Sequence, residues 1–178
     1  MQLIIKTQDL RDALNKVLSV VDRKNTRPIL NYCRIETDEK SQTLFLLATD
    51  IEISVQLQLK ADVKRAGQFC INPKNLFEIV REMPCENLTL EIDTSEKLLK
   101  IYHEDIRFSL LYVDSSEFPK IIFGQSTGRT GRFPARSLLD AINRTSHAIS
   151  HDETRPFLNG IFFQIIDGRF RAVATDGH

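Results

Sequence analysis

A chain of 178 residues, of which 42% are hydrophobic and 27% charged, is long enough to bury a core in one medium domain or slightly more. Its 24 basic and 24 acidic side chains cancel, so the net charge gives no sign of a nucleic-acid or membrane partner. No apolar run approaches the ~20 residues of a membrane span, and the first residues lack the pattern of a signal peptide, so we expect neither.

The three cysteines, Cys33, Cys70 and Cys85, are odd in number and far apart. They fit neither a disulfide framework nor a zinc site built from Cys-x2-Cys pairs. We therefore expect a reduced, cytoplasmic protein with no metal and no cofactor.

The chain begins with a predicted strand and an amphipathic helix. Residues 2–6 predict a short strand. Over residues 8–22 the apolar side chains recur at i, i+3, i+4, i+7, i+8 and i+11, which is one stripe of a helix, and Thr7 is its expected cap. Residues 28–37 and 43–49 then predict two strands joined by a polar turn.

The next segment alternates apolar and polar side chains over residues 51–59, which predicts a half-buried antiparallel strand. A second helix is predicted over residues 71–84, with Asn72 as its cap and Pro73 at its first position. Three further strands are predicted at 87–93, 97–103 and 107–113. This order indicates an α+β domain with antiparallel sheets and two helices.

Residues 124–131, GQSTGRTG, form the glycine-rich stretch of the chain. They lack the GxxxxGK[ST] spacing of a phosphate-binding loop and fall where a domain boundary is expected. The predicted organisation is a first domain over 1–122, a linker over 123–131 and a second domain over 132–178.

The pattern of the first domain begins again after the linker. Residues 10–31 and 138–159 align without a gap at an offset of 128 (138 minus 10), and both contain the hexapeptide TRPxLN. The motifs FLLATD and AVATD then match across a hairpin that is two residues shorter. This is the signature of a tandem domain repeat. The second copy stops after its first strand, helix and hairpin, so we expect a fragment of a longer protein.

The chain resembles the bacterial sliding clamp, the beta subunit family of DNA polymerase III. The resemblance covers essentially all 178 residues and is carried by TRPILN…ATDIEISV, NPKNLFEIVREMP, RFSLLYVDSSEFP and above all TRPFLNGIFFQ…RAVATDGH. Family members have three such domains, and two chains close a ring around duplex DNA. The resemblance implies a non-catalytic processivity factor for DNA replication, a homodimer when full length, with domain three absent here.

The resemblance also implies sequence-independent contacts to double-stranded DNA. A sliding ring needs only loose contacts to phosphates, which carry no sequence information. The candidates are Arg23 and Lys24 in the loop after the first helix, and Arg11, Lys16, Arg136 and Arg144 on the helices that would line the hole. Each could instead be an ordinary solvated side chain.

A pocket for partner peptides and a ring joint are implied in the same way. In the family the replicative polymerase catalytic subunit, the clamp loader and repair polymerases insert short hydrophobic motifs between domains two and three. That pocket maps onto Leu158, Thr175, Gly177 and His178, with Arg155 adjacent, although core packing and a simple turn are alternatives. The ring joint maps onto Lys74, Ile79, Arg107 and Leu110.

Two other functional classes remain open. His147 and His151 are four residues apart beside acidic residues, a spacing that can hold zinc, but no HExxH glutamate is present. Asp50 and Asp176 could be interpreted as the paired carboxylates of an enzyme, but they are equivalent positions in two copies and should lie far apart. A tandem-domain scaffold without a DNA role is also compatible with the neutral charge.

Overall fold

The computed structural model describes residues 1–21, 27–121, 123 and 131–178. The chain divides into two compact units, Met1–Phe123 and Gly124–His178. The candidate DNA contacts Arg23 and Lys24, and most of the predicted linker, lie outside the described residues.

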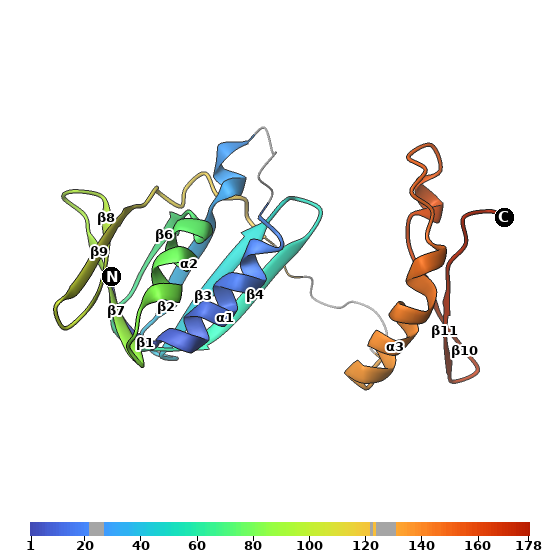
Figure 1. Ribbon diagram of the computed structural model, residues 1–178, viewed down its shortest axis with the longest axis horizontal. Coiled ribbons are helices and arrows are strands. Elements are labelled where there is room, and N and C mark those ends of the chain that lie inside the picture. The colour runs from blue at the N-terminus through green and yellow to red at the C-terminus, as the bar shows by residue number, and fades with distance from the viewer. Residues whose placement is uncertain (22–26, 122, 124–130) are drawn as a thin grey trace. The chain divides into compact units, whose positions relative to one another are not determined.

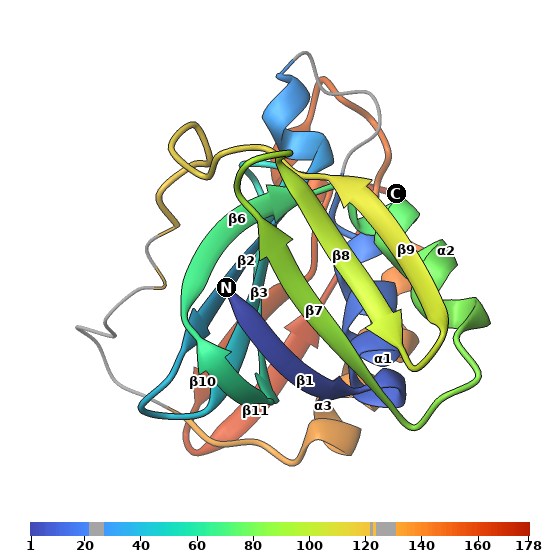
Figure 2. The same ribbon diagram turned by 90° about the vertical axis from the view of Figure 1, so that its left-hand side faces the viewer.

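Two antiparallel sheets and two helices form the first unit (Figures 1 and 2). One sheet has the strand order β5-β1-β7-β8-β9, and the other has the order β4-β3-β2-β6. The strands are β1 (Gln2–Lys6), β2 (Cys33–Asp38), β3 (Thr43–Thr49), β4 (Ser54–Lys60), β5 (Asp62–Arg65), β6 (Gly67–Ile71), β7 (Asn87–Asp93), β8 (Leu98–His103) and β9 (Ile106–Leu111). This is the α+β architecture that the sequence predicts.

The helices α1 (Thr7–Leu18) and α2 (Pro73–Glu82) lie side by side against the sheets (Figure 1). Each helix turns one apolar stripe inward, and Leu10, Leu14 and Leu76 are fully buried among the strands in one shared core. Burial of each such side chain stabilises the fold by about 1.5–3 kcal/mol.

The start of α2 agrees with the sequence, whereas the start of α1 does not. Asn72 Oδ1 accepts hydrogen bonds from the backbone N–H of Lys74 at 3.0 Å and of Asn75 at 3.2 Å, so it caps α2 as predicted. Thr7 is not a cap, because it is already the first residue of α1. Its hydroxyl is buried and lies 3.6 Å from the Cys85 sulfur.

Other predictions for the first copy are wrong in detail. Residues 28–31 form the 3-10 helix η1 (Pro28–Asn31) instead of a strand, because the fixed φ of proline suits the first position of a helix. Ile51 and Ile53 lie in the turn before β4, so the strand begins at Ser54. The short strand β5 escapes the sequence pattern because it buries only Val63.

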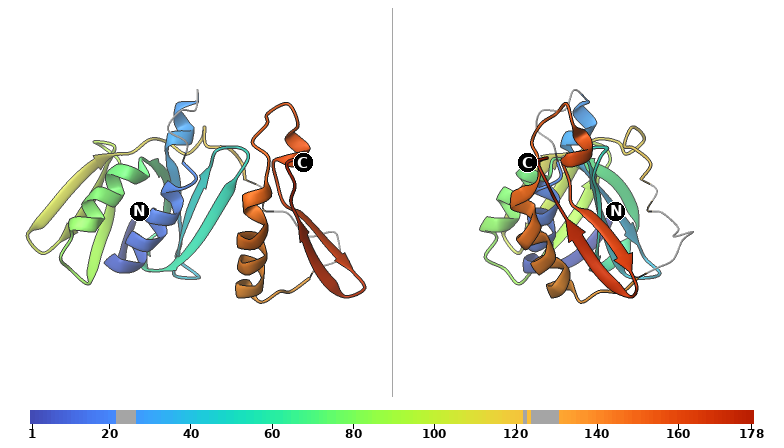
Figure 3. Two further views of the ribbon diagram at one scale, coloured as in Figure 1. Left: turned by 45° about the vertical axis from the view of Figure 1, so that its right-hand side comes forward. Right: turned by 90° about the vertical axis from the view of Figure 1, so that its right-hand side faces the viewer.

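In the second unit one helix packs against a β-hairpin (Figure 3). The elements are α3 (Ala135–Thr145), the 3-10 helices η2 (Ser146–Ala148) and η3 (Pro156–Leu158), and the strands β10 (Phe162–Ile166) and β11 (Arg169–Val173). Asp167 and Gly168 form the hairpin turn with φ of 50° and 72°, as a two-residue turn between right-twisted strands requires. The first strand expected in this copy is not present among the described residues 131–134.

The two copies fold alike where the sequence repeats. In each copy a short 3-10 helix begins at the proline of the repeated motif. The two copies differ in how deeply these residues are buried. Leu30 and Ile35 are 0% exposed in the first copy. In the second copy, the counterpart Leu158 is half-buried and the counterpart Phe163 is 45% exposed.

Candidate functional site

The structure brings the residues predicted for the peptide pocket together on one side of the second unit. Leu158 belongs to η3, Arg155 immediately precedes that helix, and Gly177 lies beyond the end of β11. A methyl group on Gly177 would lie 3.0 Å from Arg155 Nη1 and 3.7 Å from Leu158 Cδ1. Gly177 also has φ +93°, a conformation that glycine adopts without strain. A glycine here therefore allows both side chains to approach the backbone.

Thr175 and Asp176 organise the turn that carries Gly177. The Gly177 N–H donates to Thr175 Oγ1 at 3.0 Å, and the His178 N–H donates to Asp176 Oδ1 at 3.1 Å. Short side chains that accept from the backbone two residues ahead stabilise turns of this kind. Thr175 therefore stabilises the turn, and the turn places Gly177 and His178 at the surface of the second unit.

The threonine of the shared Ala-Thr-Asp motif makes the same hydrogen bond in the first copy, whereas the aspartate accepts from one residue further along the chain. The Ile51 N–H donates to Thr49 Oγ1 at 3.0 Å, and the Ile53 N–H donates to Asp50 Oδ1 at 2.6 Å. The motif is therefore a repeated turn, and the copies differ in the residues immediately after it.

Arg155 is held in place by a carboxylate three residues earlier. Its Nε donates to Asp152 Oδ2 at 2.9 Å. The other carboxylate oxygen of Asp152 accepts from the Thr154 hydroxyl at 2.6 Å and from the Thr154 N–H at 2.9 Å. These hydrogen bonds, those from Thr154 first, lower the pKa of Asp152 below its usual value, so this carboxylate is ionised at neutral pH. Sequence reasoning missed Asp152, although its i, i+3 spacing from Arg155 was available as a signal.

The four described candidates for DNA contact have different surroundings. Lys16 on α1 and both Arg136 and Arg144 on α3 are exposed. Arg11 is half-buried, and its guanidinium lies near the end of α2, where Nη2 donates to the Val80 carbonyl at 3.5 Å. The structure therefore gives Arg11 a packing role between the helices and leaves the other three accessible to phosphates.

The candidate joint residues gather in part around one groove. Ile79 and Leu110 line a groove of about 390 Å³ between α2 and β9, the edge strand of its sheet. Lys74 lies one turn away and pairs with Glu78 of the groove at 3.8 Å. Arg107 is not among the lining residues, because the alternation of a strand places it on the face opposite Leu110, with its guanidinium 5.9 Å from the Tyr102 ring.

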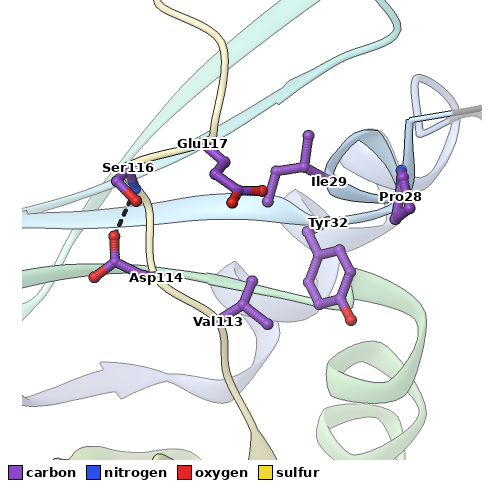
Figure 4. A pocket seen from close by; sticks show the side chains of 7 residues that line it. All are labelled: Pro28, Ile29, Tyr32, Val113, Asp114, Ser116 and Glu117. Atoms are coloured by element: carbon purple, nitrogen blue, oxygen red, sulfur yellow. Dashed lines mark hydrogen bonds between the residues drawn. The ribbon is translucent and has the colours of Figure 1, made fainter.

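A further groove of about 330 Å³ was not predicted (Figure 4). It lies between η1 and the segment after β9, and Figure 4 shows Ile29, Tyr32 and Val113 on its apolar side, with Glu117 and a hydrogen-bonded Asp114–Ser116 pair along the rim. Its two sides are about 80 residues apart in the sequence, so no local pattern could reveal it.

Comparison with known proteins decides the family. The family model described as the DNA polymerase III beta subunit, N-terminal domain, matches residues 1–122. The model described as the central domain of the same subunit matches residues 132–178. The chain belongs to the DNA polymerase III beta subunit family. The predicted resemblance and the tandem clamp fold are confirmed.

Individual members of the beta subunit family are similar in sequence to this chain over its whole length. The chain is 33% identical over 185 residues to the beta sliding clamp of Caulobacter vibrioides, covering 100% of this chain and 48% of the relative. It is 30% identical over 177 residues to that of Chlamydia pneumoniae, covering 99% and 47%. The chain thus spans about half the length of the curated relatives it matches.

Solved beta subunit structures share the fold. The Caulobacter crescentus beta subunit has a TM-score of 0.87 at 33% identity, covering 100% of this chain and 49% of that one. A Bartonella birtlesii sliding clamp bound to griselimycin has a TM-score of 0.86 at 32% identity, covering 100% and 48%.

The residues considered for other functional classes lie in separate places. His147 lies in η2 and His151 lies beyond its end, so the two are not on one continuous helix. Among the described residues, no group of three or more His, Cys, Asp or Glu is arranged to hold a metal ion. Asp50 and Asp176 each accept a backbone N–H in their own turn. No helix in the described part of this beta subunit chain is long and apolar enough to cross a bilayer.

Proposed function

We propose that the protein acts in DNA replication as a non-catalytic sliding clamp, a ring that encircles duplex DNA and tethers the polymerase to it. The observation that carries the proposal is the sequential match of two clamp domains, with Arg155, Leu158 and Gly177 brought together in the second. The proposed organisation is a first domain over 1–122, a linker over 123–131 and second-domain residues over 132–178. Its proposed location is the cytoplasm.

Topological retention explains why a neutral protein can serve as a DNA-bound factor. A protein that binds DNA by contacts alone needs many phosphate-neutralising cations, and its affinity then falls steeply with salt. A closed ring needs only a few, such as Lys16, Arg136 and Arg144 on the exposed helix faces. Arg23 and Lys24 remain proposed contacts from the sequence.

The proposed partners dock at the cluster formed by Arg155, Leu158 and Gly177. Leu158 offers a half-exposed apolar surface, and the absence of a side chain at Gly177 lets a ligand approach the backbone. Short hydrophobic motifs of the replicative polymerase, the clamp loader and repair polymerases are the proposed ligands. Thr175 fixes the turn, and His178 is exposed beside it.

Ring closure is proposed to use the edge of the first unit. The strand β9 is the last of its sheet, so its outer backbone groups can pair with a strand of another subunit. Ile79 and Leu110 line the groove beside it, and Lys74 lies close by. A homodimer at the full length of the family is the proposed assembly, and Arg107 is proposed to belong to its joint from the opposite face of β9.

Primer extension tests the tethering function. The protein at the full length of its family is loaded with its clamp loader on a primed circular template, and the product length per binding event of its polymerase is measured. We expect much longer products with the clamp, and a return toward the unclamped length in Leu158→Ala, which removes the apolar surface. Products of equal length with and without the clamp would falsify the proposal.

A further inference from the structure

We propose that Asp152 is a positioning residue of the peptide pocket, which holds the Arg155 guanidinium over Gly177 before any ligand binds. The inference rests on the proposed function, because it assigns a part to a residue beside that pocket. It concerns a carboxylate that does not come within 4 Å of a methyl group placed on Gly177 and that acts through Arg155.

Asp152 is well suited to hold another side chain because it is itself fixed. Its N–H donates to Ser150 Oγ at 3.1 Å, and its Oδ1 accepts from Thr154 at 2.6 Å and 2.9 Å. Ser150 is 5% exposed, and its N–H donates to the Leu158 carbonyl at 3.1 Å. The loop that carries Asp152 is therefore tied to the 3-10 helix that carries Leu158.

The hold on Arg155 uses one of its five donors. Nε donates to Asp152 Oδ2 at 2.9 Å, and the Arg155 N–H donates to the Asp152 carbonyl at 3.1 Å. Among the hydrogen bonds of the described residues, none uses Nη1 or Nη2 of Arg155. Nη1 lies over Gly177, so the outer edge of the guanidinium is turned to the pocket with its donors available for a ligand oxygen.

Fixing an arginine in advance matters for affinity. A long charged side chain loses rotamer freedom when a ligand orders it, and preorganisation removes part of that loss. The pair itself is about two-fifths exposed on each side, with side-chain exposures of 42% for Arg155 and 37% for Asp152. Pairs this exposed add little to stability. The geometry therefore points to positioning.

The first copy supports this assignment through the repeat. At the offset of 128, Asp152 corresponds to Lys24 and Arg155 corresponds to Arg27. A lysine has three donors and no acceptor, so it cannot receive a hydrogen bond from the arginine. A carboxylate at this loop position therefore occurs only in the copy that carries Gly177.

The test measures binding of a fluorescein-labelled pentapeptide with two leucines and one phenylalanine, by fluorescence anisotropy, to the protein at the full length of its family. Asp152→Asn keeps an acceptor for Thr154 but loses the charge that holds Arg155. We expect Kd to rise about tenfold in Arg155→Ala and about fivefold in Asp152→Asn, and the double variant to bind no worse than Arg155→Ala alone. The matched control Glu153→Gln, which neutralises the neighbouring exposed carboxylate and leaves the Oδ2–Nε bond of Asp152 in place, should stay within about twofold.

The outcomes separate the inference from the proposed function. If Arg155→Ala and Leu158→Ala bind the peptide like the wild type, the pocket itself is wrong. If those two lose affinity but Asp152→Asn does not, only the positioning role is wrong. Effects that multiply in the double variant to about fiftyfold also overturn it, because independent residues add in free energy. Thermal unfolding of each variant verifies that the loop change leaves the fold intact.

Discussion

Ile51 and Gly177 both directly follow the repeated Ala-Thr-Asp motif and both have a positive φ. The first copy has a β-branched residue at this position, whereas the second copy has a glycine. Their φ values are 86° and 93°, and each N–H donates to the threonine hydroxyl two residues earlier at 3.0 Å. Glycine adopts this conformation freely, whereas a β-branched residue is strained in it. The strain at Ile51 is maintained by the hydrogen bonds of Thr49 and Asp50 around it.

Relief of this strain is predicted to stabilise the first unit. Strain of this kind costs about 1–3 kcal/mol, and glycine gives back about 0.5–1 kcal/mol through the greater entropy of the unfolded chain. Ile51→Gly should therefore raise the free energy of unfolding by about 1 kcal/mol, as measured by urea denaturation. Its side chain is 57% exposed, so little packing is lost.

Ile53→Gly is the matched control for this prediction. Ile53 is equally exposed, at 59%, but it does not have a positive φ. We expect this change to lower the free energy of unfolding by about 0.5 kcal/mol. A loss of stability in both variants would show that Ile51 is not strained.

At the scale of elements, the sequence predicts those whose signals are local. The asparagine–proline start of α2 and the apolar stripe of α1 need only a few neighbouring residues to be recognised. The strand β5 depends on a distant partner, because it pairs with β1 across about 60 residues. Tertiary pairing decides such short segments.

In the candidate site, too, some residues could be predicted from the sequence and others could not. Arg155, Leu158 and Gly177 are predicted by the family resemblance, and the structure brings them together. The role of Asp152 depends on the path of a loop. The contact of Arg11 with α2 depends on the Val80 carbonyl, which is 69 residues away in the sequence. Neither contact can be inferred from hydrophobic periodicity.

The cap of α2 provides a prediction at this scale. Asn72→Ala leaves the N–H groups of Lys74 and Asn75 without their acceptor, and it should lower the free energy of unfolding by about 1 kcal/mol. Urea denaturation measures the change. Asn72→Ser, which restores an oxygen acceptor, should recover most of it, and equal losses in the two variants would contradict the cap.

At the scale of the whole molecule, hydrogen-bonded carboxylates make the stability depend on pH. Hydrogen bonds lower the pKa of several aspartates: Lys100 and then Ser95 act on Asp93, and Ser116 acts on Asp114. A carboxyl whose pKa is lower in the folded state binds protons more readily when unfolded. Its contribution is present above the unfolded pKa and is lost as the pH falls through the folded pKa.

We therefore predict that the free energy of unfolding declines below about pH 4, near the unperturbed pKa of aspartate. Asp93→Asn should make this decline shallower, because it removes the carboxylate that Lys100 holds at 2.7 Å. Urea titrations at several pH values from neutral to strongly acidic measure the slope. An identical slope in the variant would assign the acid sensitivity to other groups.

The proposed clamp holds DNA by encircling it, and the topology of the DNA provides the test. The protein at the full length of its family is loaded by its clamp loader on a nicked DNA circle, the complex is isolated by gel filtration in high salt, and the DNA is then linearised. We predict that the protein stays on circles and leaves linear DNA, because a ring can slide off a free end whereas salt weakens only contact binding. Equal retention on both forms, or release from circles by salt alone, would contradict the clamp.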